Sequence, residues 1–218
     1  MTFETLIAAA TSSLKPTDSV AFALGLMMEL RVRHLPVVSA DGILLGLISE
    51  EQLLDAAGPE AAVETILGSR VISVLPDSHV FDGTQVMMKY DLTTVPVARE
   101  DGSYVGLVRR HDVFGWFARM LSTHESGAIL ALEIDPRDYA LSKLLYTVEQ
   151  NDVKVLSVAT ERMEHKVGVT LKLNVKDASR VRHMLEHHGY NVVAAFGEDE
   201  GDEELMDRIQ AFMRYLEV

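Results

Sequence analysis

The sequence contains no cysteine. This absence excludes disulfides, thiolate nucleophiles and cysteine–zinc sites, and it fits a protein that works in the reducing cytoplasm. The sequence also lacks any apolar run near the roughly 20 residues that a membrane-spanning helix needs. Residues 1–10 include Glu4 but no lysine or arginine, so we expect no signal peptide. The sequence therefore predicts a cytoplasmic chain that does not enter a membrane.

Positive charge is scarce. The 20 lysine and arginine residues are outnumbered by 33 aspartate and glutamate residues, so the net charge is −13. This balance disfavours nonspecific binding to the phosphates of nucleic acids. The acidic excess is strongest in residues 197–218. Against this background two short basic clusters stand out, namely Arg31 with Arg33 and His34, and Arg109 with Arg110 and His111.

Motifs typical of catalysis are missing as well. There is no Gly-x-Ser-x-Gly, no Gly-Lys-Ser/Thr phosphate loop and no cluster with metal-ligand spacing. His183 and His187 are four residues apart on a predicted helix, but a zinc site needs a third ligand. We interpret His188 as a packed histidine on the apolar side of that helix. The sequence thus predicts a protein that is not an enzyme and requires no cofactor or metal.

A repeat with an offset of 60 residues organises the first half of the chain. Residues 34–49 predict two apolar strands with a turn at Asp41-Gly42, and residues 94–109 predict the same unit. Aligning 14–54 with 74–114 gives 10 identities in 41 positions, and these are prolines, glycines, one aspartate and apolar residues. Shared backbone geometry is therefore what repeats. In this interpretation Asp-Gly supplies the positive φ angles of a two-residue hairpin turn.

The second half has a different pattern. Strands and helices are predicted in the order βαββαβ, which is a ferredoxin-like sandwich. Asp135-Pro136 predicts the start of its first helix, because aspartate caps helices and proline suits the first helical position. Gly189 predicts the end of its second helix. A closing acidic helix is expected from about Asp202 to Leu216.

The paired repeats resemble tandem CBS motifs, the arrangement called a Bateman module. The resemblance rests on Leu35-Pro36-Val37-Val38 and Val95-Pro96-Val97-Ala98, each followed by Asp-Gly and then by Gly-Leu and Ile or Val. The second half resembles an ACT-type domain, and the whole is similar to acetoin-utilisation accessory proteins. The expected fold class is therefore α/β (α+β), a CBS-domain pair followed by a βαββαβ ferredoxin-like domain. The expected limits are 1–121 for the CBS pair (repeats about 10–58 and 70–121), 127–197 for the ACT-like domain and 198–218 for the acidic helix.

The resemblance implies a regulatory sensor. CBS pairs hold adenosine compounds such as AMP, ADP, ATP or S-adenosylmethionine, and the family motif is Gly-h-h-Ser/Thr-x-x-Asp, where h is apolar. The hydroxyl usually contacts phosphate and the carboxylate contacts ribose. Ser49 fits this motif in the first repeat, where Gln52 replaces the aspartate. Asp112 fits it in the second repeat, where Arg109 replaces the hydroxyl residue.

The nucleotide-binding residues that the resemblance implies fall into three groups: motif residues, basic residues that reach phosphate, and strand residues beside adenine. They are Asp112, Ser49, Arg109, Arg110, Arg33, His34, Val95, Pro96, Val97, Leu35 and Pro36.

Each residue interpreted as ligand-binding also has a purely structural interpretation. Asp112 and Ser49 can simply cap the helices that follow them, and the second basic cluster can be solvated surface. The four methionines at 27, 28, 87 and 88 are most simply core residues. The ACT-like domain can bind an amino acid or pair with another subunit, and we expect a homodimer with a possible regulated protein partner. The alternative function is a structural oligomerisation module whose ligand clefts have degenerated.

Overall fold

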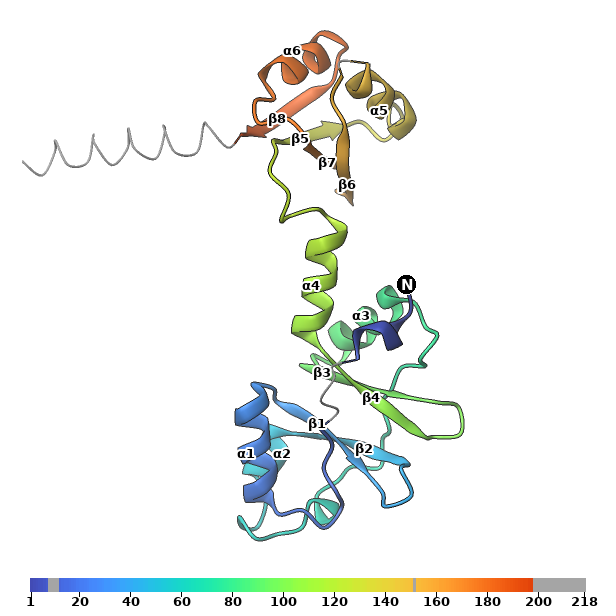
Figure 1. The fold of residues 1–218 in the computed structure, drawn as a ribbon, viewed down its shortest axis with the longest axis vertical. Coiled ribbons are helices and arrows are strands. Elements are labelled where there is room, and N and C mark those ends of the chain that lie inside the picture. Colours follow the sequence, from blue (N-terminus) through green and yellow to red (C-terminus); the bar gives the residue numbers. More distant parts are fainter. Residues whose placement is uncertain (8–11, 151, 198–218) are drawn as a thin grey trace, which may run out of the picture. The chain divides into compact units, whose positions relative to one another are not determined.

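The computed structural model describes residues 1–7, 12–150 and 152–197 (Figure 1). The chain forms two compact units, Met1–Trp116 and Phe117–Val218. The division falls within α4 (Arg110–Met120), before the linker that the sequence predicts at 122–127. The expected fold class is confirmed, with the repeat pair in the first unit and a βαββαβ sandwich in the second.

The two repeats fold alike. In each, a helix leads into an antiparallel hairpin and a second helix, and the hairpin registers match at the 60-residue offset, with Leu35 opposite Ile48 and Val95 opposite Val108. Leu14 and Val74 each add a short parallel bridge to the hairpin. The elements are α1 (Val20–Leu30), β1 (His34–Val38), β2 (Leu44–Ser49) and α2 (Glu50–Leu54), followed by α3 (Val80–Lys89), β3 (Thr94–Ala98), β4 (Tyr104–Arg109) and α4.

The hairpin turns differ from the two-residue turn expected from Asp41-Gly42. The Gly42 N–H donates to the Ser39 carbonyl, and only the glycines, Gly42 and Gly102, have positive φ, at 79° and 83°. A turn closed in this way, with glycine in the left-handed region, leaves a bulge, which matches the register shift after Val37. The freed carbonyls join the repeats, because Gly102 O accepts from Leu44 N and Gly42 O accepts from Tyr104 N.

The repeat extends further toward the N-terminus than the sequence comparison showed. Two short 3-10 helices, η1 (Phe3–Leu6) and η2 (Val63–Thr65), are related by the same offset. The Phe3 N–H donates to Ser78 O and the Val63 N–H donates to Asp18 O, so each helix packs on the other repeat. The two repeats are therefore closed by exchanged segments rather than merely placed side by side.

Side-chain size is matched at these exchanged contacts. Phe3 is fully buried, and a Cβ at Gly83 in α3 would lie 2.1 Å from its ring. In the first repeat the equivalent pair is Val63 and Ala23, which share one core cluster. The larger ring thus meets glycine and the smaller valine meets alanine.

The second unit is a four-stranded antiparallel sheet in the order β6-β7-β5-β8, with α5 and α6 packed on it. This is the strand order of a ferredoxin-like sandwich, and its core lies between the helices and the sheet. Its elements are β5 (Ile129–Ile134), α5 (Leu141–Glu149), β6 (Val155–Arg162), β7 (Val167–Leu173), α6 (Ser179–His187) and β8 (Asn191–Phe196).

Several local predictions are wrong. The helix expected at Asp135 begins instead at Leu141, because the Asp135 side chain and carbonyl accept N–H bonds from Arg137 and Asp138 and close a turn. His188 is exposed rather than packed, and its Nδ1 lies 2.8 Å from the Met184 carbonyl.

The methionine prediction holds for only half of the set. Met27 and Met87 are buried, but Met28 and Met88 are 77% and 74% exposed, because they fall on the outer faces of α1 and α3. Within the described ranges no helix is both long and apolar enough to cross a membrane. The predicted helix at 202–216 lies outside the described residues.

We predict that Gly83→Ala destabilises the first unit, because the added methyl group displaces the Phe3 ring from its site on α3. Overpacking of this kind typically costs about 1–3 kcal/mol. Gly25→Ala is the matched control, since Gly25 lies in α1 and nothing is within 4 Å of the added Cβ. The control should gain about 0.5–1 kcal/mol from helix propensity. Urea unfolding measures both; equal stability changes would contradict the packing account.

Candidate functional site

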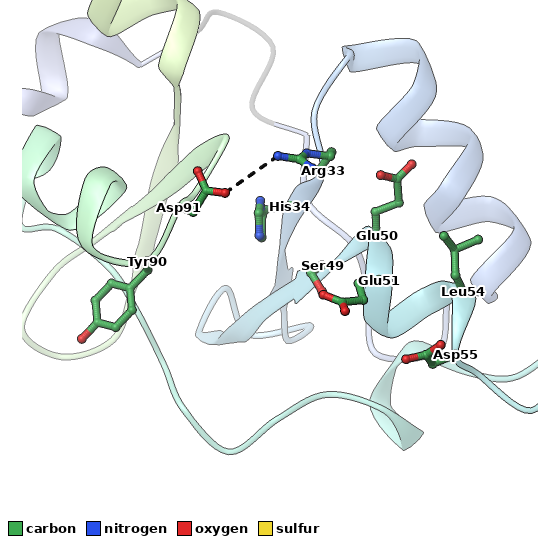
Figure 2. Close-up of a pocket in the computed structure, with 9 residues that line it drawn as sticks. All are labelled: Arg33, His34, Ser49, Glu50, Glu51, Leu54, Asp55, Tyr90 and Asp91. Carbon is green, nitrogen blue, oxygen red and sulfur yellow. Dashed lines mark ion pairs between the residues drawn. The ribbon is translucent and has the colours of Figure 1, made fainter.

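A cavity of about 420 Å³ lies where the two repeats meet (Figure 2). Its size is within the range of small-molecule sites. The first repeat supplies one side from the start of β1 and from α2, and the second repeat supplies the other side from the end of α3. We call this cavity the inter-repeat cleft. It is lined by Arg33, His34, Ser49, Glu50, Glu51, Leu54, Asp55, Tyr90 and Asp91.

Ser49 caps α2 and also lines the cleft. Its Oγ accepts from the Gln52 N–H at 3.2 Å, and Gln52 Oε1 accepts from the Ser49 N–H at 2.9 Å, which makes a capping box. The capping interpretation is therefore confirmed for Ser49. The cap uses only a lone pair of the hydroxyl, so the hydroxyl proton remains available for a ligand. Gln52, which replaces the family's aspartate, is committed to the cap.

In the second repeat, Arg109 holds the motif carboxylate. Arg109 Nε lies 2.8 Å from Asp112 Oδ2 and Nη2 lies 3.0 Å from Oδ1, a bidentate pair. The carboxylate raises the pKa of the Arg109 guanidinium above its ordinary value. The Arg109 backbone N–H also donates to Asp112 Oδ2. Neither residue lines the inter-repeat cleft, so the structure does not bring them together with Ser49, Arg33 and His34.

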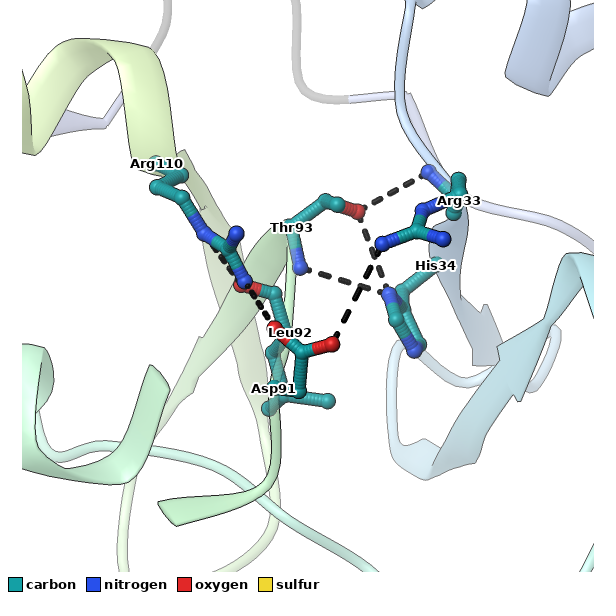
Figure 3. A network of polar contacts seen from close by, with 6 residues as sticks. All are labelled: Arg33, His34, Asp91, Leu92, Thr93 and Arg110. Carbon is teal, nitrogen blue, oxygen red and sulfur yellow. Dashed lines mark hydrogen bonds and ion pairs between the residues drawn. The ribbon is translucent and has the colours of Figure 1, made fainter. Parts of the chain in front are cut away.

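Arg110 stabilises a loop at the edge of the cleft (Figure 3). Its Nε and Nη2 donate to the Leu92 carbonyl at 3.0 and 2.7 Å, and Nη2 also lies 2.8 Å from Asp91 Oδ1. Asp91 Oδ2 faces Arg33 Nη2 at 4.0 Å. The hydrogen bond from Arg110, followed by the charge of that group, lowers the pKa of Asp91. Asp91 therefore links basic residues of both repeats and was missed by the sequence reasoning.

His34 joins the repeats through Thr93 and Thr94. Its Nδ1 accepts from the Thr93 N–H at 3.3 Å and lies 3.1 Å from Thr93 Oγ1, while Thr94 Oγ1 donates to the His34 carbonyl at 2.7 Å. The Arg33 N–H donates to Thr93 Oγ1 at 2.9 Å (Figure 3). Burial, then the charge of Arg33, lowers the pKa of His34 below its ordinary value. His34 is thus a neutral acceptor at neutral pH.

The predicted adenine-contacting residues lie in the core. Leu35, Val95 and Val97 have no exposed surface, and Pro36 and Pro96 are buried beside them. None of the five is part of the cleft wall. Their contact with a ligand stays a prediction, and it requires their backbone groups or a rearrangement of the hairpins.

Among the residues that the structure describes, no group of three or more His, Asp or Glu side chains is placed to hold a metal ion. His183 pairs instead with Glu186, Nδ1 to Oε2 at 3.6 Å. In the second unit a separate cavity of about 370 Å³ lies beside Asp135, Asp138 and Lys143. Amino-acid binding and pairing with another subunit both stay predictions for this unit.

Comparison with known proteins gives a family for the first half of the chain. A family model described as CBS domain matches residues 12–58 and 63–119. Inosine-5'-monophosphate dehydrogenase of Korarchaeum cryptofilum is 28% identical over 163 residues, which are 74% of this chain and 34% of that protein. The chain thus spans about a third of the length of that relative.

Solved structures show a similar fold. A structure described as an acetoin utilization protein from Vibrio cholerae aligns with a TM-score of 0.50 and 24% identity, over 57% of this chain and 95% of that one. A CBS domain pair/ACT domain protein from Thermotoga maritima aligns with a TM-score of 0.50 and 17% identity, over 56% and 99% of the two chains. At these identities the likeness concerns the fold.

We predict that His34 makes the first unit less stable below neutral pH. Because the folded-state pKa of His34 lies below its unfolded value of about 6.5, the unfolded chain binds the proton first. The contribution is complete above the unfolded pKa and is lost as the pH falls. His34→Asn keeps an acceptor for the Thr93 N–H but does not titrate. Between about pH 7.5 and about pH 5.5, wild type should lose more unfolding free energy than this variant. Equal losses would contradict the assignment.

Proposed function

Residues 12–58 and 63–119 are CBS domains, and from this premise we propose that the chain is a non-catalytic regulatory sensor that binds an adenosine compound in the inter-repeat cleft. One observation carries the proposal. Ser49 of the motif lines the cleft together with Arg33 and His34, which stand directly before Leu35-Pro36. Tyr90 and Asp91 of the other repeat complete the wall. The proposed setting is the cytoplasm.

The cleft offers groups for each part of such a ligand. The Ser49 hydroxyl can donate a hydrogen bond, and the side chain of Leu54 provides apolar surface for a base. Carboxylates on α2 can accept hydrogen bonds from ribose hydroxyls, in place of the aspartate that Gln52 replaces. Arg33 is 59% exposed at its side chain and can reach one anionic group.

The position of the cleft suits regulation. Its wall comes from both repeats, and the hydrogen bonds of His34 and Thr93 join the repeats beside it. A ligand that fits one arrangement of the repeats better than another shifts the population toward that arrangement. The readout is then a change in contacts with a second copy of the chain or with a regulated protein.

A structural role is the second candidate. Met28 and Met88 occupy equivalent positions and are both largely exposed, and Leu54 and Phe114 form a second such pair at 68% and 70% exposure. Exposed apolar side chains repeated at equivalent positions favour a self-association surface. In this alternative the chain is a dimerisation module, and the cleft takes no ligand.

We predict that an adenosine compound raises the unfolding temperature of the chain. The panel is adenosine, AMP, ADP, ATP and S-adenosylmethionine. A ligand present at about 100 times its Kd stabilises the folded state by about 2.7 kcal/mol. Ser49→Ala removes the cleft hydroxyl and should weaken binding about tenfold, measured by calorimetry.

Asp112→Ala is the matched comparison, because Asp112 holds the other motif position and is paired with Arg109 away from the cleft. Its binding constants should equal those of wild type. Loss of binding in this variant alone would place the ligand at the second repeat. No shift with any compound of the panel would leave the dimerisation module as the remaining function.

We predict that the chain is a dimer in solution and that Met28→Lys with Met88→Lys makes it a monomer. A buried lysine without a partner opposes association, whereas both methionines are exposed in the single chain and can be replaced without loss of the fold. Val71→Lys, at a 51% exposed site between η2 and α3, is the control. Sedimentation velocity distinguishes the species; a double variant that remains dimeric excludes α1 and α3 from the interface.

A further inference from the structure

The inter-repeat cleft is acidic although it is the proposed site of a nucleotide. Its wall holds four carboxylates, those of Glu50, Glu51, Asp55 and Asp91, against the single guanidinium of Arg33. With His34 counted as neutral, the lining residues carry a formal charge of −3 (four negative groups and one positive), and Arg110, which pairs with Asp91 at 2.8 Å from outside the wall, reduces the local charge to −2. Figure 2 shows Glu50 and Glu51 in α2 and Asp55 directly after it, on the same side of the cavity as Ser49.

The positions equivalent to most of these acidic residues carry basic ones. At the 60-residue offset, Glu50 corresponds to Arg110 and Asp91 corresponds to Arg31. Ser49 corresponds to Arg109, and Glu51 to His111. Equivalent backbone positions therefore carry opposite charges, so the acidic wall does not simply follow from the acidic composition of the chain.

The one arginine of the cleft can reach a single anionic group only in competition with a carboxylate that it already faces. Arg33 Nη2 already faces Asp91 Oδ2 at 4.0 Å, and Asp91 is held by Arg110 at 2.8 Å. An incoming phosphate would have to compete with this carboxylate while it approached those of Glu50, Glu51 and Asp55. Each further phosphate adds repulsion, because charges separated by less than the Debye length of about 8 Å at physiological ionic strength are only partly screened.

We infer that the inter-repeat cleft selects its adenosyl ligand by charge, with Glu50, Glu51 and Asp55 as the specificity-determining residues. The ligand class that fits is an adenosyl compound with a cationic group, of the sulfonium kind present in S-adenosylmethionine, and metal-free ADP and ATP are disfavoured. The inference rests on the proposed function, because it assigns the ligand class of the same cleft. The cationic group lies against the carboxylates of Glu50, Glu51 and Asp55, and the adenosyl part lies against Leu54.

The test compares binding constants for S-adenosylmethionine, adenosine and metal-free ATP by calorimetry. Wild type should bind S-adenosylmethionine most tightly and metal-free ATP at least about tenfold more weakly. The triple variant Glu50→Gln, Glu51→Gln, Asp55→Asn keeps the shape of the wall and removes its charge. In that variant the preference should vanish, through weaker binding of S-adenosylmethionine and tighter binding of ATP.

The matched control is Glu29→Gln with Glu60→Gln and Glu100→Gln, which changes the net charge equally at exposed residues outside the cleft. It should retain the wild-type preference. Added salt should weaken S-adenosylmethionine binding in wild type and strengthen ATP binding. A further titration uses ATP with Mg²⁺, which neutralises part of the phosphate charge. The affinity of wild type for Mg²⁺-ATP should lie between its affinities for S-adenosylmethionine and for metal-free ATP.

The outcomes separate the two claims. If metal-free ATP binds wild type as tightly as S-adenosylmethionine, selection by charge is overturned while the sensor function stands. If the cleft triple variant and the control triple variant behave alike, the three carboxylates are not the determinants. If no adenosyl compound binds, the proposed function itself fails.

Discussion

The reciprocal packing of the two repeats is the constraint on which the first unit depends. The short helix before each repeat closes the other one, through Phe3 N–H to Ser78 O and Val63 N–H to Asp18 O. The hairpin turns add a second exchange, Leu44 N–H to Gly102 O and Tyr104 N–H to Gly42 O. Neither repeat therefore satisfies its backbone or fills its core alone. These contacts hold together the two repeats that line the inter-repeat cleft.

Much of this architecture could be read from sequence because local backbone requirements repeat visibly. The Asp-Gly turns and the alternation in residues 167–175 gave the hairpins and the βαββαβ order. Predictions failed where contacts distant in sequence decide which side chains are buried, or where a competing turn decides where a helix begins. Asp135 closes a turn instead of capping a helix, and Met28 faces outward although Met27, beside it, is buried. The exchange of η1 and η2 was missed because only Glu4/Glu64 and Thr5/Thr65 are identical there.

The site was predictable in part. Ser49, Arg33 and His34 do lie together, since the hairpin register places the start of β1 beside the end of β2. Asp112 and Arg109 do not join them, because Arg109 stands three residues before a carboxylate and pairs with it. Asp91 could not be found from a motif, because it lines the cleft only through the packing of the other repeat. A comparison of charges at the 60-residue offset would have pointed to it.

The duplication thus preserves the backbone of the two repeats but not the charges of their polar side chains. Proline, glycine and core residues keep the two backbones equivalent, whereas the polar residues around the cleft have diverged to opposite sign. If both repeats had kept the same polar residues, pseudo-symmetry would make two similar sites and a ligand would bind without distinguishing the halves. Arg110 stands at the position equivalent to Glu50, and Arg31 stands at the position equivalent to Asp91. A charged ligand therefore interacts unequally with the two repeats. Such a ligand moves a conformational equilibrium only if its interaction free energy differs between two arrangements of the repeats, and a ligand held unequally by the two halves meets this condition whenever their spacing changes.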